Sequence, residues 1–116
     1  MLGLYNYRAI IVGIVDGDTV DAKIDFGFGL TQKHRLRLAR VNAPEIKSPD
    51  EAVRAKAIDA RNWLISKLAD QAVTVTIHKS DIYGRYIAEI MYDGKDSLRN
   101  ISDDLLAAGL AVAYKG

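Results

Sequence analysis

The 116-residue sequence contains no cysteine, which excludes disulfides, thiolate metal ligands and cysteine nucleophiles. It also lacks any run of 18 consecutive apolar residues, so no transmembrane helix is expected. Its first residues do not form a basic segment followed by a long apolar one, as a signal peptide would. We therefore expect a cytoplasmic protein that makes no contact with a membrane.

A strong excess of charge is missing as well. The formal net charge is +1, a weak argument for nucleic-acid binding, because nucleic-acid-binding proteins usually carry a clear basic excess. The distribution of charge is more informative. Residues 16–25 hold four aspartates, and residues 33–40 hold four lysine or arginine side chains with no acid among them. Blocks of opposite sign that meet across a hairpin would place a metal site beside a phosphate clamp.

The remaining composition is that of an ordinary globular domain. Hydrophobic residues make up 49% of the chain and charged residues 27%. A chain of this length is one domain and can bury one core. We therefore expect residues 1–116 to form a single, monomeric domain.

Hydrophobic alternation predicts three consecutive strands in the first half of the chain. Residues 5–15 are apolar on both parities, which suits a strand inside a closed barrel, and residues 20–26 alternate cleanly between apolar and charged. Residues 35–38 alternate arginine with leucine, as a half-buried strand does. Glycines at 27 and 29 turn the chain between the second and third strands. These three strands are expected to form a meander.

A helix and two further strands follow. Ser48 as the capping residue, Pro49 and Glu51 together predict a helix start. The apolar stripe behind it comprises Val53, Ala57, Ala60, Leu64 and Leu68. Strands are expected around residues 73–77 and 88–90, then a short helix that begins near Asn100 or Ser102 and stops at Gly109, and then an extended segment.

Five strands with one helix between the third and fourth is the order of an OB-fold. We therefore predict a mainly β, α+β chain: a five-stranded OB-fold β-barrel with one core-packing helix and a short C-terminal helix. This barrel is a common platform for binding oligonucleotides, although a fold alone does not define a function.

The segment from Arg37 to Glu45 carries the most specific chemistry. The strand register breaks at Arg40, and such breaks often re-aim side chains at functional sites. Pro44 then presents Glu45 just beyond the strand end. A carboxylate beside arginines suits phosphodiester hydrolysis, which needs a base for water and positive groups for the phosphate.

The residues supply a candidate for each task. Asp18, a side-chain oxygen of Asn42 and a backbone carbonyl would suit a hard cation such as Ca²⁺. Glu45 can serve as the base, and Arg37 and Arg85 can bind the phosphate in a bidentate manner. For Arg35 and Arg37 taken alone, an exposed basic face on an edge strand is the preferred explanation, and the other segments of the site decide against it.

Four segments resemble the staphylococcal nuclease (thermonuclease) family in order and approximate spacing. These are Asp-Gly-Asp-Thr at 16–19, the stretch from Arg37 through Ala43-Pro44-Glu45, the turn at 81–85, and Gly109-Leu110-Ala111 with Tyr114. Each segment is weak alone, but together they are specific. The resemblance spans nearly the whole chain. It implies a Ca²⁺-dependent endonuclease of DNA and RNA, preferentially single-stranded, with little sequence specificity and 3′-phosphate products.

The resemblance also implies roles for individual residues. Arg37, Glu45 and Arg85 would be catalytic, with Glu45 as general base. The metal ligands would be Asp18, Asn42 and the carbonyl of Ala43. Substrate contacts would come from Arg35, Tyr83 and Tyr114, and the metal site would be supported by Asp16 and Thr19. From the residues alone, Tyr83 and Tyr114 are equally consistent with core or rim aromatics.

Two departures from the family pattern leave a second hypothesis open. Asn42 replaces a carboxylate and Ala43 a threonine, so weaker metal binding is expected. The alternative is an OB-fold module that binds single-stranded nucleic acid with little or no catalysis. Retention of Glu45 together with Arg37 and Arg85 favours the enzyme, and Asn42 favours the module. A protein-interaction barrel is a third hypothesis, with nothing specific in its favour.

Overall fold

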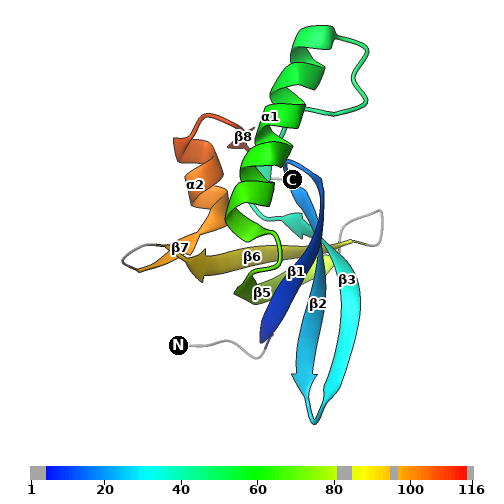
Figure 1. Cartoon of the computed structure of the whole chain (residues 1–116), viewed down its shortest axis with the longest axis vertical. Coiled ribbons are helices and arrows are strands. Elements are labelled where there is room, and N and C mark those ends of the chain that lie inside the picture. The colour runs from blue at the N-terminus through cyan, green and yellow to red at the C-terminus, as the bar shows by residue number, and fades with distance from the viewer. Residues whose placement is uncertain (1–4, 81–84, 95–96, 115–116) are drawn as a thin grey trace.

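The computed structural model describes residues 5–80, 85–94 and 97–114. At its centre five strands form a closed barrel, whose arrangement with the helices is seen in Figure 1. The meander comprises β1 (Asn6–Asp16), β2 (Thr19–Gly27) and β3 (Leu30–Leu38). The strand β5 (Ala72–Ser80) lies between β1 and β6 (Tyr86–Asp93), antiparallel to both. Parallel pairing of β3 with β6 closes the barrel. The predicted OB-fold barrel is therefore confirmed.

Three short strands lie outside the barrel. β4 (Val41–Asn42) pairs with β8 (Val112–Ala113), and β7 (Leu98–Asn100) pairs with the end of β6. The extended conformation expected near residue 112 is confirmed, but its partner was not predicted. The β4–β8 pair is important for the site because it holds the end of the described chain against Asn42.

The helix α1 (Glu51–Leu68) stands between the third and fourth barrel strands, as predicted. It buries Ala57, Ala60, Leu64 and Leu68. The predicted cap at Ser48 is wrong. Asp50 is the N-cap, because its carboxylate accepts hydrogen bonds from the first free backbone N–H groups of the helix, whereas the Ser48 hydroxyl accepts only from the Asp50 N–H. Within the described residues, no helix is long and apolar enough to cross a membrane.

The second helix, α2 (Ile101–Ala107), begins and ends where the sequence indicates. The side chain of Asn100 caps it by accepting from two backbone N–H groups. Gly109 follows with φ +72°, a conformation that glycine adopts without a steric penalty. Ile101 and Leu105 are fully buried, so α2 packs its apolar side into the core.

The alternation of β2 and β3 correctly indicates which side chains face inward. Val20 and Leu36, for example, are fully buried. For β1 the prediction of burial on both faces is wrong, because Ile10 and Val12 are 48% and 46% exposed. Closure of the barrel buries only its interior, and the outer face of β1 keeps these two apolar side chains in contact with solvent.

Candidate active site

The site lies where the β1–β2 turn meets the end of β3. Leu38 donates its backbone N–H to the carbonyl of Asp18 at 2.8 Å, and Thr19 pairs with Arg37 across the two strands. Gly17 is required in this turn, because a Cβ there would lie 2.8 Å from the Cβ atoms of both Ala43 and Ala60. The turn is therefore held between β3, the loop after β4, and α1.

Three contacts hold the carboxylate of Asp18, which is only 8% exposed. Its Oδ1 accepts from the Thr19 hydroxyl at 3.0 Å, and its Oδ2 accepts from the backbone N–H of Ala43 at 2.9 Å. The guanidinium of Arg37 forms an ion pair with Oδ2 at 3.5 Å. These contacts fix the carboxylate and leave oxygen lone pairs for a further ligand.

Arg37 connects the elements of the site. Its Nη1 donates to the carbonyl of Leu38 at 3.0 Å, and its Nη2 donates to Asn42 Oδ1 at 3.2 Å. The guanidinium also lies over the ring of Tyr114, 5.5 Å from the centroid, which is a cation–π contact. The side chain is therefore a buried, preorganised cation with its position set from several directions.

Asp16 forms a second carboxylate beside Asp18. Its Oδ1 accepts from the backbone N–H of Asp18 at 3.1 Å. Burial raises the pKa of Asp16 to about 6, and the neighbouring carboxylate of Asp18 adds to that increase. A positive charge placed here would favour the ionised form of Asp16. The acidic turn is thus an environment that attracts a cation.

The oxygen atoms that could serve as ligands for a hard cation come from Asp18, Asn42 and Ala43. Asp18 Oδ2 and Asn42 Oδ1 both lie within 3.5 Å of the same nitrogen of Arg37, so an anionic and a neutral oxygen converge on a point that already attracts positive charge. The peptide of Ala43 lies beside them. Oxygen ligands of this kind suit Ca²⁺. Among the described residues, no group of three or more His, Cys, Asp or Glu side chains is arranged to hold a metal.

The other predicted catalytic and substrate-binding residues include Glu45, Arg85 and Tyr83. Glu45 is exposed just after Pro44, and its backbone carbonyl accepts from the N–H of Ser48 at 3.2 Å. Arg85 is partly buried directly before β6, two residues from Ile87, which pairs with Arg37. Two residues span roughly 7 Å along a strand, so the backbone of Arg85 lies near that of Arg37. Tyr83 lies outside the described residues.

Arg35 is directed to a different partner. Its Nε lies 2.9 Å from Asp21 Oδ1, and the pair is largely exposed on the arginine side. The guanidinium lowers the pKa of the Asp21 carboxyl. Arg35 is therefore tied to β2, and only its open side remains available to a substrate.

Arg40 holds the site together, a role that the sequence did not reveal. It has φ 68°, and its guanidinium donates to Glu89 at 2.9 Å and to Asp103 at 2.8 Å. Its backbone carbonyl accepts from the N–H of Tyr114 at 2.9 Å. The ion pair lowers the pKa of Glu89. Arg40 thereby joins the β3–β4 turn to β6, α2 and β8, and the register break at this residue was the only signal.

The fold is that of an OB barrel, a class whose members commonly bind oligonucleotides or oligosaccharides. A family model described as staphylococcal nuclease homologue matches residues 35–116. The chain therefore belongs to the staphylococcal nuclease family.

Individual relatives agree with this assignment. Endonuclease Htp3 of Saprolegnia parasitica is 29% identical over 118 residues, covering 93% of this chain and 56% of that protein. Micrococcal nuclease of Shigella flexneri is 33% identical over 115 residues, covering 95% of this chain and 60% of that protein. Probable endonuclease lcl3 of Penicillium rubens is 32% identical over 85 residues, covering 69% and 29% respectively. The chain thus spans three fifths or less of the length of these relatives.

Proposed function

We propose that this protein is an endonuclease that hydrolyses phosphodiester bonds of DNA and RNA, preferentially in single strands and with little sequence specificity. It acts as a single monomeric domain, depends on Ca²⁺, and leaves 3′-phosphate and 5′-hydroxyl ends. The observation that carries the proposal is the convergence of Arg37, Asp18 and Asn42 at the end of β3. Membership of the family and the names of the relatives support the reaction class.

Arg37 is suited to bind the phosphate. Its guanidinium is buried, so its interaction with an anion is less screened than at the surface. The phosphate would replace Asn42 as its partner, while Leu38 and Tyr114 continue to orient the guanidinium. Arg85 would supply a second guanidinium for the charge that grows in the transition state. Preorganised donors of this kind need no rearrangement during the reaction.

Asp18, Asn42 and the Ala43 carbonyl would hold the Ca²⁺ ion. When bound, this ion would neutralise charge on the phosphate. Asp16 and Thr19 support the site. The Asp16 carboxylate accepts from the backbone N–H of Asp18, and the Thr19 hydroxyl donates to the Asp18 carboxylate. Their role is to keep the metal ligand in one orientation.

Glu45 would act as the general base. Its exposure allows it to take a proton from a water molecule next to the bound phosphate, and Pro44 restricts the backbone that carries it. Arg35 would contact the substrate backbone from its solvent side, and Tyr83 and Tyr114 would contact the nucleotide.

A cleavage assay tests the proposal. The purified protein is incubated with single-stranded DNA, with RNA and with duplex DNA, in Ca²⁺ or in chelator, and the ends of the products are analysed. We expect Ca²⁺-stimulated cleavage with 3′-phosphate ends, fastest on the single strands. Retarded migration of the single strands without cleavage in any metal would contradict the proposal.

Such a result would instead support a module that binds single-stranded nucleic acid without cleaving it. The observation in favour of this second function is Asn42, which brings no charge to the metal site and whose side-chain oxygen already accepts a hydrogen bond from Arg37. A basic, aromatic surface is sufficient for binding, whereas an exposed carboxylate beside the phosphate would weaken it. Glu45 therefore favours the enzyme.

Replacing Asn42 by aspartate is expected to lower the Ca²⁺ concentration needed for half-maximal cleavage. The two side chains are nearly isosteric, and the change adds one negative charge where Asp18 already supplies one, on which Ca²⁺ affinity depends. The measurement is a Ca²⁺ titration of the initial cleavage rate. Asn62→Asp, the same change at an exposed position of α1, is the matched control. An unchanged half-maximal concentration in Asn42→Asp would show that residue 42 is not a metal ligand.

A further inference from the structure

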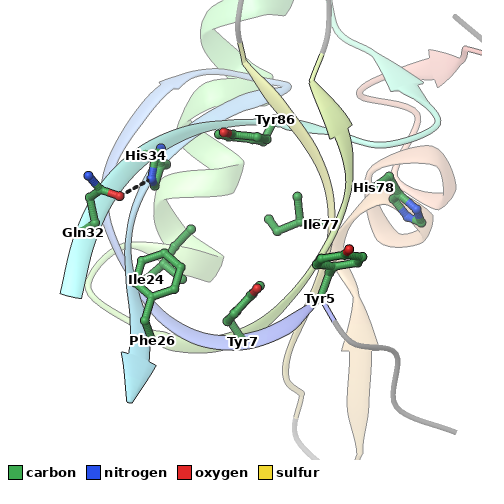
Figure 2. A pocket seen from close by; sticks show the side chains of 9 residues that line it. All are labelled: Tyr5, Tyr7, Ile24, Phe26, Gln32, His34, Ile77, His78 and Tyr86. Carbon is green, nitrogen blue, oxygen red and sulfur yellow. Dashed lines mark hydrogen bonds between the residues drawn. The ribbon is translucent and has the colours of Figure 1, made fainter. Parts of the chain in front are cut away.

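The open end of the barrel, away from α1, is a cavity of about 430 Å³ (Figure 2). It arises because the inward-facing positions of the strands continue beyond the packed core. Ala9 on β1, Leu36 on β3 and Ala88 on β6 face inward and are fully or nearly fully buried. Two residues further along each of these strands, toward this end of the barrel, the inward-facing residue is aromatic: Tyr7, His34 and Tyr86. On β2 the corresponding ring is Phe26. We call this opening the barrel mouth.

The rings surround the barrel mouth and do not close it. Tyr7 and Phe26 form an edge-to-face pair with centroids 5.4 Å apart, and His34 and Tyr86 form another at 5.3 Å. Figure 2 shows these pairs on different sides of the opening, with Ile24 and Ile77 also facing it. If the rings only sealed the core, they would fill the space between them. The remaining volume is instead in the range of small-ligand pockets.

The lining favours a flat, uncharged group with polar edges. The described lining residues are tyrosine, phenylalanine, isoleucine, glutamine and histidine, with no carboxylate, lysine or arginine among them. His34 Nε2 and Gln32 Oε1 are hydrogen-bonded at 2.8 Å, which leaves the Gln32 amide nitrogen and the second ring nitrogen of His34 for a ligand. A nucleobase combines a stacking face with donor and acceptor edges, so it matches this lining in both respects.

The position of the barrel mouth connects it to the candidate active site. Leu36 pairs with Tyr86, and Arg37 pairs with Ile87, so the two sites use adjacent residues of the same two strands. The side chains diverge, because successive residues of a strand point to opposite faces. Tyr86 faces the barrel mouth, whereas Arg37 faces the outer site with Tyr114. On these two strands the barrel mouth and the outer site are therefore one residue position apart.

We propose that the barrel mouth is a nucleobase subsite that takes one unpaired base of the single-stranded substrate. The inference rests on the proposed function, because the substrate of that function supplies the base. The subsite is separate from the contacts around Arg37 and Tyr114. It provides a physical reason for a preference for single strands, since a base within a duplex cannot enter a cavity without being unpaired.

The test compares two oligonucleotides of equal length and charge, a single-stranded DNA and the same backbone made abasic throughout. Binding is measured by fluorescence anisotropy in chelator, so that cleavage does not interfere. The variants are Phe26→Ala and Tyr86→Leu, on different strands and 42% and 40% exposed, so that neither opens the packed core. Phe28→Ala is the control, because Phe28 is fully exposed on the same hairpin and does not line the cavity.

We expect both variants to bind the base-bearing strand roughly five- to a hundredfold more weakly than the unmodified protein, the usual range for losing one base-stacking contact. Binding of the abasic strand and the salt dependence of binding should not change, because phosphate contacts are intact. Thermal unfolding confirms that each variant is folded. Weakened binding in both variants but not in Phe28→Ala supports the subsite. Unchanged binding in either folded variant overturns it.

The outcome is separable from that of the proposed function. Cleavage in Ca²⁺ together with unchanged binding in the two variants would leave the nuclease in place and remove the subsite. If the unmodified protein neither cleaves nor binds the single strand, both the nuclease function and the nucleobase subsite are overturned. A base-dependent loss of binding without cleavage in any metal would support the subsite and contradict the nuclease.

Discussion

Glu45→Gln is expected to lower the rate of phosphodiester cleavage by about a hundredfold or more, the usual cost of removing a general base. The amide keeps the size of the side chain and loses the ability to accept a proton. Glu45 is exposed, so the change should leave the free energy of unfolding almost unaltered. The measurement is the initial rate on single-stranded DNA at saturating Ca²⁺. Glu51→Gln, the same change at an exposed position in the first turn of α1, is the matched control and should retain full activity.

Arg37→Ala and Arg85→Ala are expected to lower the same rate to a comparable degree, because each removes a positive donor from the phosphate. Arg37→Ala also removes the ion-pair partner of the buried Asp18, so its stability has to be measured alongside its activity. If Glu45→Gln and both arginine variants keep the activity of the parent protein, these three residues are not the catalytic ones.

The second large effect concerns the barrel core. Leu38→Ala and Ile90→Ala are each expected to lower the free energy of unfolding by roughly 2 to 5 kcal/mol, because each leaves a cavity where a large side chain was fully buried. Leu38 is 1% exposed on β3 and Ile90 is 0% exposed on β6, the two strands whose pairing closes the barrel. Urea unfolding measures the change. Lys23→Ala, at an exposed position of β2, is the control and should cost little. Equal small decreases in the free energy of unfolding for all three variants would mean that Leu38 and Ile90 are wrongly assigned to the inward face of the barrel.

Much of the fold follows from local patterns. Alternation in β2 depends only on residues close in sequence, because successive side chains of any strand point to opposite faces. The start of α2 follows from Asn100, whose side chain bonds to N–H groups two and three residues away. The start of α1 was misplaced by two residues for a related reason. Ser48 and Asp50 are both capping residue types, and the sequence pattern does not determine which of them adjoins the first turn.

The candidate site likewise contains contacts that are local in sequence and contacts that are distant in sequence. The Asp18 carboxylate accepts from the Thr19 hydroxyl, and the Asp18 backbone N–H donates to the carboxylate of Asp16. The Asp-Gly-Asp-Thr segment already indicates these contacts, because they join residues no more than two positions apart. Arg40 is the opposite case, since its partners Glu89 and Asp103 lie 49 and 63 residues away. In the sequence, the distribution of charge grouped Arg40 with the other basic residues, and the break in alternation marked only a strand end. Only the closed barrel and α2 bring the two acids to it.

Arg35 and Arg37 show most clearly what the sequence determined and what only the tertiary structure decided. Both lie on the same face of β3, so the sequence by itself determined their shared direction. Their environments differ, with side-chain exposures of 54% and 10%. Asp18 of the acidic turn and Tyr114 near the C-terminus both contact Arg37, whereas the guanidinium of Arg35 pairs with Asp21 on the neighbouring strand. Strand geometry is a local property of the backbone, but burial and charge depend on segments distant in sequence, and only folding brings these together.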